Sequence, residues 1–116
     1  MVGSFGSVEG TTESTTEAHL TVDLIGQSGG EAAANYEDVA DYDGAGRMIA
    51  QAVDTFGRLD IVVNNAGIVR DATIWNMAES DFDAVLRVHI KGTWAPCKHA
   101  AMHWREVNKT TGQPVG

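Results

Sequence analysis

The residues best suited to bind a ligand lie between positions 58 and 71, where an apolar run precedes two asparagines, an alanine and a glycine. Residues 59–63 are typical of a strand buried on both faces, and in open α/β sheets ligands bind at the carboxyl ends of such strands. Gly67 and Ala66 leave room for a flat ring or a ribose near the backbone, and the Asn65 amide can pair with a ligand. A tight turn explains the same residues, so local chemistry leaves both interpretations open.

His89 is the second candidate for chemistry. It falls on the apolar side of a long helical pattern, so we expect its imidazole to point inward, where each ring nitrogen needs a partner. A histidine satisfied within the core and a histidine that relays protons both fit this position. His99 and His103 lie one helical turn apart, but two imidazoles lack the third and fourth ligands of a metal site. We therefore predict no metal centre.

The composition excludes several functional classes. The chain has 116 residues, of which 43% are hydrophobic and 21% are charged, as in an ordinary globular domain. Sixteen acidic and eight basic side chains give a net charge of -8, which disfavours nucleic acid and anionic membranes as partners. Cys97 is the single cysteine, and no apolar run approaches the roughly 20 residues that span a bilayer. We expect a cytoplasmic protein without membrane or nucleic-acid partners.

The first part of the chain carries weak structural signals. Residues 1–12 are rich in glycine and turn-forming residues, which predicts a loop. Ser14 and Glu17 fit a capping box at the start of a short helix that ends at Gly26. Residues 31–36 are rich in alanine and favour a helix on propensity, although their local sequence does not decide between helix and strand.

Stronger patterns surround the candidate ligand site. Asp41 or Asp43 can cap a helix that Gly57 closes, and the order helix, buried strand and glycine turn predicts an α/β domain with a parallel sheet. A long helix follows, in which Pro96 clashes with the carbonyl of Gly92, so we expect a kink there. Its apolar positions predict one packed face, consisting of Phe82, Val85, Leu86, Ile90, Trp94, Cys97, Ala101 and Trp104.

The buried strand followed by NNAG, together with the preceding helix that ends in FGRLD, resembles the short-chain dehydrogenase/reductase family. The resemblance runs from about Ser14 to the end of the chain and implies a Rossmann domain, in which residues 31–36 form a strand. NNAGIVRDATIWNM, DFDAVLRVHIKGTW and HAAMHWRE are most similar to the branch that acts on 3-hydroxyacyl thioesters. The implied activity is NAD- or NADP-dependent interconversion of a secondary alcohol and a ketone, with an acyl thioester as substrate.

The resemblance also implies a cofactor-binding role for five residues. Asp38 and Val39 match an Asp-hydrophobic pair that meets the adenine ring in relatives, although a carboxylate after a strand is also ordinary turn chemistry. Asn65, Ala66 and Gly67 correspond to the segment that lines the adenosine ribose and the nearby phosphates.

Two further positions lie on the long helix. Val88 matches a residue that packs near the nicotinamide half of the cofactor. His89 stands at the helix position of an Asn-Ser-Tyr-Lys tetrad, which implies a part in a proton relay. Relatives pair through this helix, so the resemblance also implies a homo-oligomer. The alternative is a non-catalytic fragment that pairs with full-length subunits.

Other family features have no counterpart in this sequence: the glycine-rich phosphate loop, the first strand, and the catalytic Ser and Tyr-x-x-x-Lys. We therefore expect residues 14–108 to form a partial Rossmann domain, a doubly wound parallel sheet that lacks its first strand and its C-terminal strands. Residues 1–13 would be a loop remnant and residues 109–116 a loose tail. Such a sheet exposes unpaired edges. We expect a truncated fragment with an incomplete cofactor site and no turnover of its own.

Overall fold

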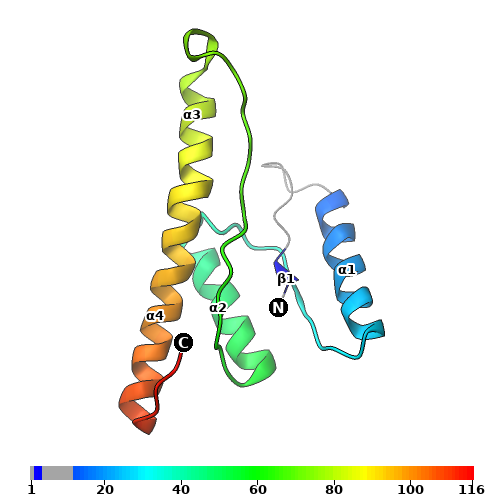
Figure 1. Ribbon diagram of the computed structural model, residues 1–116, viewed down its shortest axis with the longest axis vertical. Coiled ribbons are helices and arrows are strands. Elements are labelled where there is room, and N and C mark those ends of the chain that lie inside the picture. The colour runs from blue at the N-terminus through cyan, green and yellow to red at the C-terminus, as the bar shows by residue number, and fades with distance from the viewer. Residues whose placement is uncertain (1, 4–11) are drawn as a thin grey trace. The chain divides into compact units, whose positions relative to one another are not determined.

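The computed structural model describes residues 2–3 and 12–116, which form two compact units. The first unit ends at Asp38 and the second begins at Val39. Figure 1 shows the elements of both units, and each unit is described by itself. Among the described residues, none of the helices combines the length and hydropathy that a membrane crossing requires.

The first unit combines one helix with a minimal parallel sheet. Strand β1 (Val2–Gly3) pairs with strand β2 (Ala34–Asn35), and helix α1 (Thr12–Gln27) lies between them in the chain. The predicted loop is therefore wrong at β1. For residues 31–36 the strand that the family resemblance implied is confirmed only at β2, because pairing with β1 satisfies backbone groups that helix propensity does not consider.

Helix α1 begins earlier than its sequence signal. Its first residue is Thr12, so Ser14 lies inside the helix and the predicted capping box is wrong. Its end is secured by backbone bonds, including the N–H of Gly30 on the carbonyl of Ile25 at 3.0 Å. The Tyr36 hydroxyl lies 2.8 Å from Nε2 of His19 and ties the chain after β2 to this helix.

The second unit opens with helix α2 (Tyr42–Phe56), whose two ends are those predicted. Asp41 is the N-cap, and its Oδ2 accepts the N–H of Gly44 at 3.0 Å. Gly57 closes the helix in the left-handed conformation, with φ of 81°, and donates its N–H to Val53 at 2.8 Å. Both caps satisfy backbone groups that a helix end leaves open.

The predicted strand at residues 59–63 is not formed in this structure. Within the described part of the chain, β1 and β2 pair only with each other, so no ladder reaches this segment. Ile61 and Val63 are 78% and 81% exposed. The apolar run has the composition of a sheet interior, but a strand needs neighbouring strands to pair its backbone.

The long helix is continuous from residue 79 to residue 111 and consists of three parts. Helix α3 (Glu79–Leu86) leads through the π-helical turn η2 (Arg87–Lys91) into helix α4 (Gly92–Thr111). A short 3₁₀ turn, η1 (Ile74–Asn76), precedes it. Because α4 ends at Thr111, the first three residues of the predicted loose tail are helical.

The irregularity predicted at Gly92 is a π turn. The N–H of Gly92 donates to the carbonyl of Arg87, five residues back, in place of the usual four. Pro96 lacks an N–H and crowds the carbonyl of Gly92, so a wider turn just before Gly92 relieves the helix. A Cβ on Gly92 would lie 2.8 Å from Cγ2 of Val39, so this glycine also allows close packing.

Helix α4 packs against α2 through the face opposite to the one predicted (Figure 1). The predicted face is largely exposed: Phe82, Ile90 and Trp94 keep 52%, 62% and 51% of their surface. Small side chains let the two helix axes approach closely, and both helices present them at the contact. The buried residues are Gly44, Ala45, Ile49 and Ala52 on α2, and Gly92, Ala95, Pro96 and Ala100 on α4.

Replacement of the α2 cap tests this helix. Asp41→Ala removes the acceptor of the Gly44 N–H and should lower the free energy of unfolding by about 1 kcal/mol, measured by urea unfolding with far-UV circular dichroism. Asp43→Ala is the matched control, because Asp43 lies in the first turn but does not serve as the cap. Equal losses in both variants would contradict the assignment of the cap.

Candidate functional site

Gly67 and His89 meet in the second unit, although 21 residues separate them in the chain. A Cβ on Gly67 would lie 2.8 Å from Cε1 and 3.3 Å from Nε2 of His89. The imidazole therefore occupies the space that any other residue at position 67 would fill with its side chain. The structure thus brings together two of the residues that the sequence singled out.

The same ring holds the backbone of the next residue. Nε2 of His89 lies 2.9 Å from the carbonyl oxygen of Ile68 and 3.3 Å from its amide nitrogen. His89 is exposed. The expected inward orientation is therefore wrong, because the ring covers the segment beside the helix instead of entering the contact between α2 and α4.

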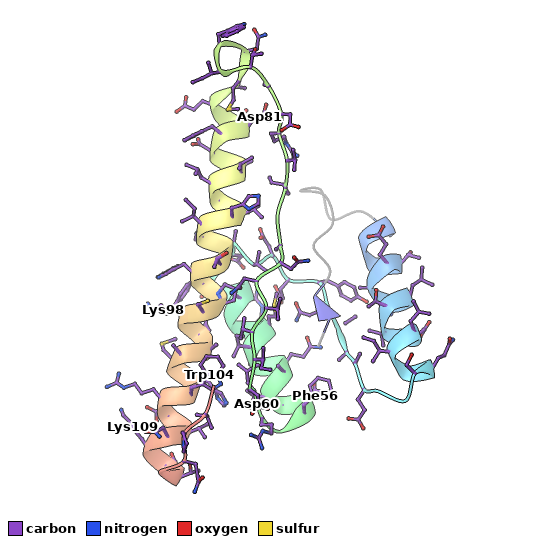
Figure 2. All side chains as sticks on the ribbon, viewed as in Figure 1. Phe56, Asp60, Asp81, Lys98, Trp104 and Lys109 are labelled. Carbon is purple, nitrogen blue, oxygen red and sulfur yellow. The ribbon has the colours of Figure 1, made fainter. Side chains whose placement is uncertain are left out.

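Two more side chains of the long helix hold this segment. Trp104 donates its indole N–H to the carbonyl of Leu59 at 2.6 Å, and Asn64 donates to Sγ of Cys97 at 3.2 Å. Figure 2 shows Trp104 on α4 beside the extended chain. His89, Cys97 and Trp104 follow one another along the helix at intervals of eight and seven residues. Each interval is about two helical turns, so the three side chains lie on one side of the helix. These three side chains hold residues 59–68 in place, a role that a neighbouring strand has in a sheet.

The remaining residues of the NNAG motif face outward. Asn65 is exposed, and within residues 12–116 its amide has no hydrogen-bond partner. Ala66 is half-buried, and Gly67 is exposed. A free amide beside backbone without bulky side chains offers a ligand one polar contact and close approach to the chain. The proposed contacts with ribose and phosphate remain predictions.

The other predicted cofactor residues lie in different surroundings. Asp38 is half-buried at the end of the first unit. Val39 begins the second unit and packs against Gly92. Val88 is only 2% exposed and lies in the π turn beside His89. Their roles toward adenine and nicotinamide remain predictions.

The second histidine of the long helix is structural. Nε2 of His99 donates to the carbonyl of Tyr42 at 2.8 Å, and the two rings lie 4.4 Å apart. A Cβ on Gly46 would lie 2.9 Å from Cε1 of His99, so the imidazole sits directly on α2. In the described ranges, no group of three side chains could hold a metal ion.

Two ion pairs flank the extended segment. Arg58 pairs with Asp60 at 2.6 Å, and the hydrogen bond and charge of Asp60 raise the pKa of Arg58. Arg70 lies 3.7 Å from Asp81, so it links the chain after NNAG to the first turn of α3. Both pairs are exposed and stabilise the fold little.

Sequence reasoning missed three contributors to this site. Ile68 gives only backbone atoms to His89, so its side chain carries no signal. Cys97 and Trp104 were assigned to a packed helix face. Their spacing of seven residues, matched by an extended run of similar length, could have indicated a helix that holds a strand-like segment.

Comparison with known proteins gives consistent matches. The family model described as short chain dehydrogenase matches residues 7–114. The hydroxyacyl-CoA dehydrogenase ChsB1 of Mycobacterium tuberculosis is 40% identical over 100 residues, which cover 83% of this chain and 31% of that protein. The chain spans between 11% and 35% of the length of the curated relatives it matches, several of which are peroxisomal enzymes.

Solved structures show the same likeness. A short chain dehydrogenase from Mycobacterium avium is 52% identical, with a TM-score of 0.79, over 84% of this chain and 34% of that chain. A Burkholderia cenocepacia short chain dehydrogenase in complex with NADP is 32% identical, with a TM-score of 0.73. The match covers 79% of this chain and 38% of that chain. These neighbours support an α/β fold.

Loss of the indole donor tests how the segment is held. Trp104→Phe keeps an aromatic ring but leaves the carbonyl of Leu59 without its donor, so the free energy of unfolding should fall by about 1 kcal/mol. Trypsin should also cut faster after Arg58, next to that carbonyl. The control is Trp75→Phe, at a position that is 81% exposed. No difference between the two variants would refute the anchoring role of Trp104.

Proposed function

Because the chain belongs to the short-chain dehydrogenase family, we propose that it supplies the adenosine-facing segment of an NAD(P)-dependent oxidoreductase. That enzyme would interconvert a secondary alcohol and a ketone. The observation that carries the proposal is the contact of Gly67 with His89, since it fixes the NNAG backbone against the long helix while Asn65 stays exposed.

The residues present fit a dinucleotide. Asn65, Ala66 and Gly67 would line the ribose and phosphates, because an amide and a backbone without bulky side chains suit a flat, polar ligand. Asp38 and Val39 would meet the adenine ring. Support for a nicotinamide cofactor comes from the structural neighbour in complex with NADP, and either NAD or NADP fits the proposal.

The chemistry would be shared between cofactor and protein. The nicotinamide supplies or accepts the hydride when it is bound, and the protein orients it. We assign Val88 to the nicotinamide half and His89 to the helix position of the catalytic tetrad. We also propose a 3-hydroxyacyl or 3-oxoacyl thioester as the substrate, which the similarity to a hydroxyacyl-CoA dehydrogenase supports.

The 116 residues alone would not complete this reaction. Neither Tyr36 nor Tyr42 is followed by a lysine four residues later, so the chain does not hold the acid that would protonate the carbonyl. We propose that it binds nucleotide without turnover. The cytoplasmic location and the lack of nucleic-acid and membrane partners remain predictions from charge and hydropathy. Reduction of an acetoacetyl thioester by the purified chain with NADH or NADPH would overturn the proposed inactivity.

Nucleotide binding is the direct test of the site. Energy transfer from tryptophan to NADH or NADPH should report binding to the full chain, and Gly67→Ala should weaken it about tenfold, because the added methyl group displaces the imidazole of His89 and disturbs the NNAG backbone. Gly26→Ala is the matched control, since a Cβ there meets nothing within 4 Å. If the unmodified chain bound neither nucleotide at millimolar concentration, the adenosine site would be rejected.

A second candidate is non-catalytic pairing through the long helix. Four large apolar side chains repeat every fourth residue on its exposed side, and such stripes mark interaction surfaces. Acidic residues gather near residue 79 and basic residues toward residue 109, so two copies in antiparallel order would place opposite charges together. The stripe consists of Phe82, Leu86, Ile90 and Trp94.

A charge in the stripe tests pairing. Ile90→Arg should shift the chain toward the monomer at least tenfold in sedimentation velocity, because a guanidinium would be buried without a partner. Met102→Arg is the control, because Met102 is 45% exposed on the same helix but lies eight residues beyond Trp94, which places it about 80° around the α-helix from the stripe. A monomeric unmodified chain, or equal effects of the two variants, would exclude this interface.

A further inference from the structure

We propose that helix α1 of one copy of the chain docks on a basic face of α4 in a second copy. The contact joins two different helices, so it is distinct from pairing of the long helix with itself, and it does not involve the nucleotide site. The basic face consists of Lys91, Lys98, Arg105 and Lys109, with Trp94 and Met102 between them.

Positive charge is concentrated on this face. The whole chain carries a net charge of -8, yet residues 84–105 contain no acidic side chain. Lys91, Lys98 and Arg105 follow one another at intervals of seven residues, about two helical turns, so they lie on one side of the helix. All three are exposed, and within residues 12–116 none of them has a carboxylate partner. Lys109 extends the row and forms an exposed ion pair with Glu106 at 3.6 Å.

The basic face also carries large apolar side chains. Trp94 and Met102 keep 51% and 45% of their surface exposed. Nζ of Lys98 lies 5.3 Å from the centroid of the Trp94 ring and 5.1 Å from that of Tyr42, so both rings attract this ammonium group. The face therefore offers cations next to apolar surface. It fits a helix that presents carboxylates next to aliphatic side chains.

Helix α1 has this complementary pattern. Its sequence contains no lysine or arginine. Ala18 is 3% exposed and lies on the side of the helix that packs within its own unit. On the opposite side Leu20 and Leu24 keep 56% and 63% of their surface exposed, and Glu17 and Asp23 beside them are exposed as well. The chain thus supplies its own acidic and aliphatic partner for the basic face.

The two faces match in spacing and in length. Glu17, Leu20 and Leu24 are separated by three and four residues, and neighbouring positions of the basic face are separated in the same way, a spacing that lets helices interdigitate. Helix α1 has 16 residues and the basic face spans residues 91–109, so both are about 25 Å long. Beyond about 8 Å the like net charges of two copies are screened at physiological ionic strength, so opposite charges in contact decide the association.

Charge reversal on each helix tests the contact. In sedimentation velocity of the full chain, Glu17→Lys and Arg105→Glu should each weaken self-association about tenfold, because each places like charges across the contact. Glu17→Lys also lowers the net negative charge, so an effect of overall charge alone would strengthen association instead. Glu31→Lys makes the same change of charge outside α1, and Arg105→Lys keeps the charge on α4, so both controls should associate like the unmodified chain.

A mixture of the two reversed variants is the decisive measurement. Each variant alone should stay monomeric where the unmodified chain associates, whereas the equimolar mixture should associate, because Arg105→Glu retains an intact α1 and Glu17→Lys an intact α4. Circular dichroism should show the same helix content in every variant, and Asp23→Lys provides a second reversal on α1. NADH binding should be unchanged, because these residues lie outside the proposed nucleotide site.

Three results would overturn the contact. The first is an unmodified chain that stays monomeric, and the second is a mixture that does not associate. The third is equal association of Glu17→Lys, Asp23→Lys and the unmodified chain, which is expected if α4 pairs with α4 alone.

Discussion

The long helix packs closely against Val39, α2 and the NNAG segment because a glycine at each of these contacts has no Cβ where another side chain lies. His99 covers Gly46, His89 covers Gly67, and Val39 covers Gly92, each at a distance that a methyl group would make a clash. Non-bonded atoms tolerate little overlap, so a side chain at any of these glycines would displace the residue that covers it. The candidate site depends on the one at position 67.

This arrangement explains why a chain with little sheet still orders the NNAG segment. Side chains of one helix face fasten the extended chain at its start, middle and end, through Trp104, Cys97 and His89. Such bonds replace only a few members of a strand ladder, so most backbone groups in the segment face water. Its apolar residues, Ile61 and Val63 above all, stay exposed. The segment is thereby fixed to the long helix at three points. The residues between these points bury little surface, so little stabilises their positions.

Local signals predicted those features that depend on few neighbouring residues. The Asp41 cap and the Gly57 stop of α2 follow from backbone groups at the helix ends, so sequence alone located them. The strand at residues 59–63 could not be predicted in the same way, because strand formation depends on distant partners. The packed face of the long helix was missed for a related reason: small size, and not hydrophobicity, selects the residues buried against α2, whereas Trp94 stays 51% exposed and stacks on Tyr42 at the start of that helix.

The site was predicted in its parts but not in its geometry. NNAG and His89 were identified by residue type and by family resemblance, whereas their contact depends on the π turn η2. An extra residue in one turn rotates everything before it by about 100° relative to everything after it. If the apolar residues of the long helix are assigned to faces at 3.6 residues per turn throughout, the assignment is therefore correct either before or after residues 87–91, but not on both sides. His89 lies within that turn, so its ring leaves the expected stripe and reaches Ile68 instead of the core. Pro96, the sequence feature that indicated an irregularity, could not show in which direction the helix would turn.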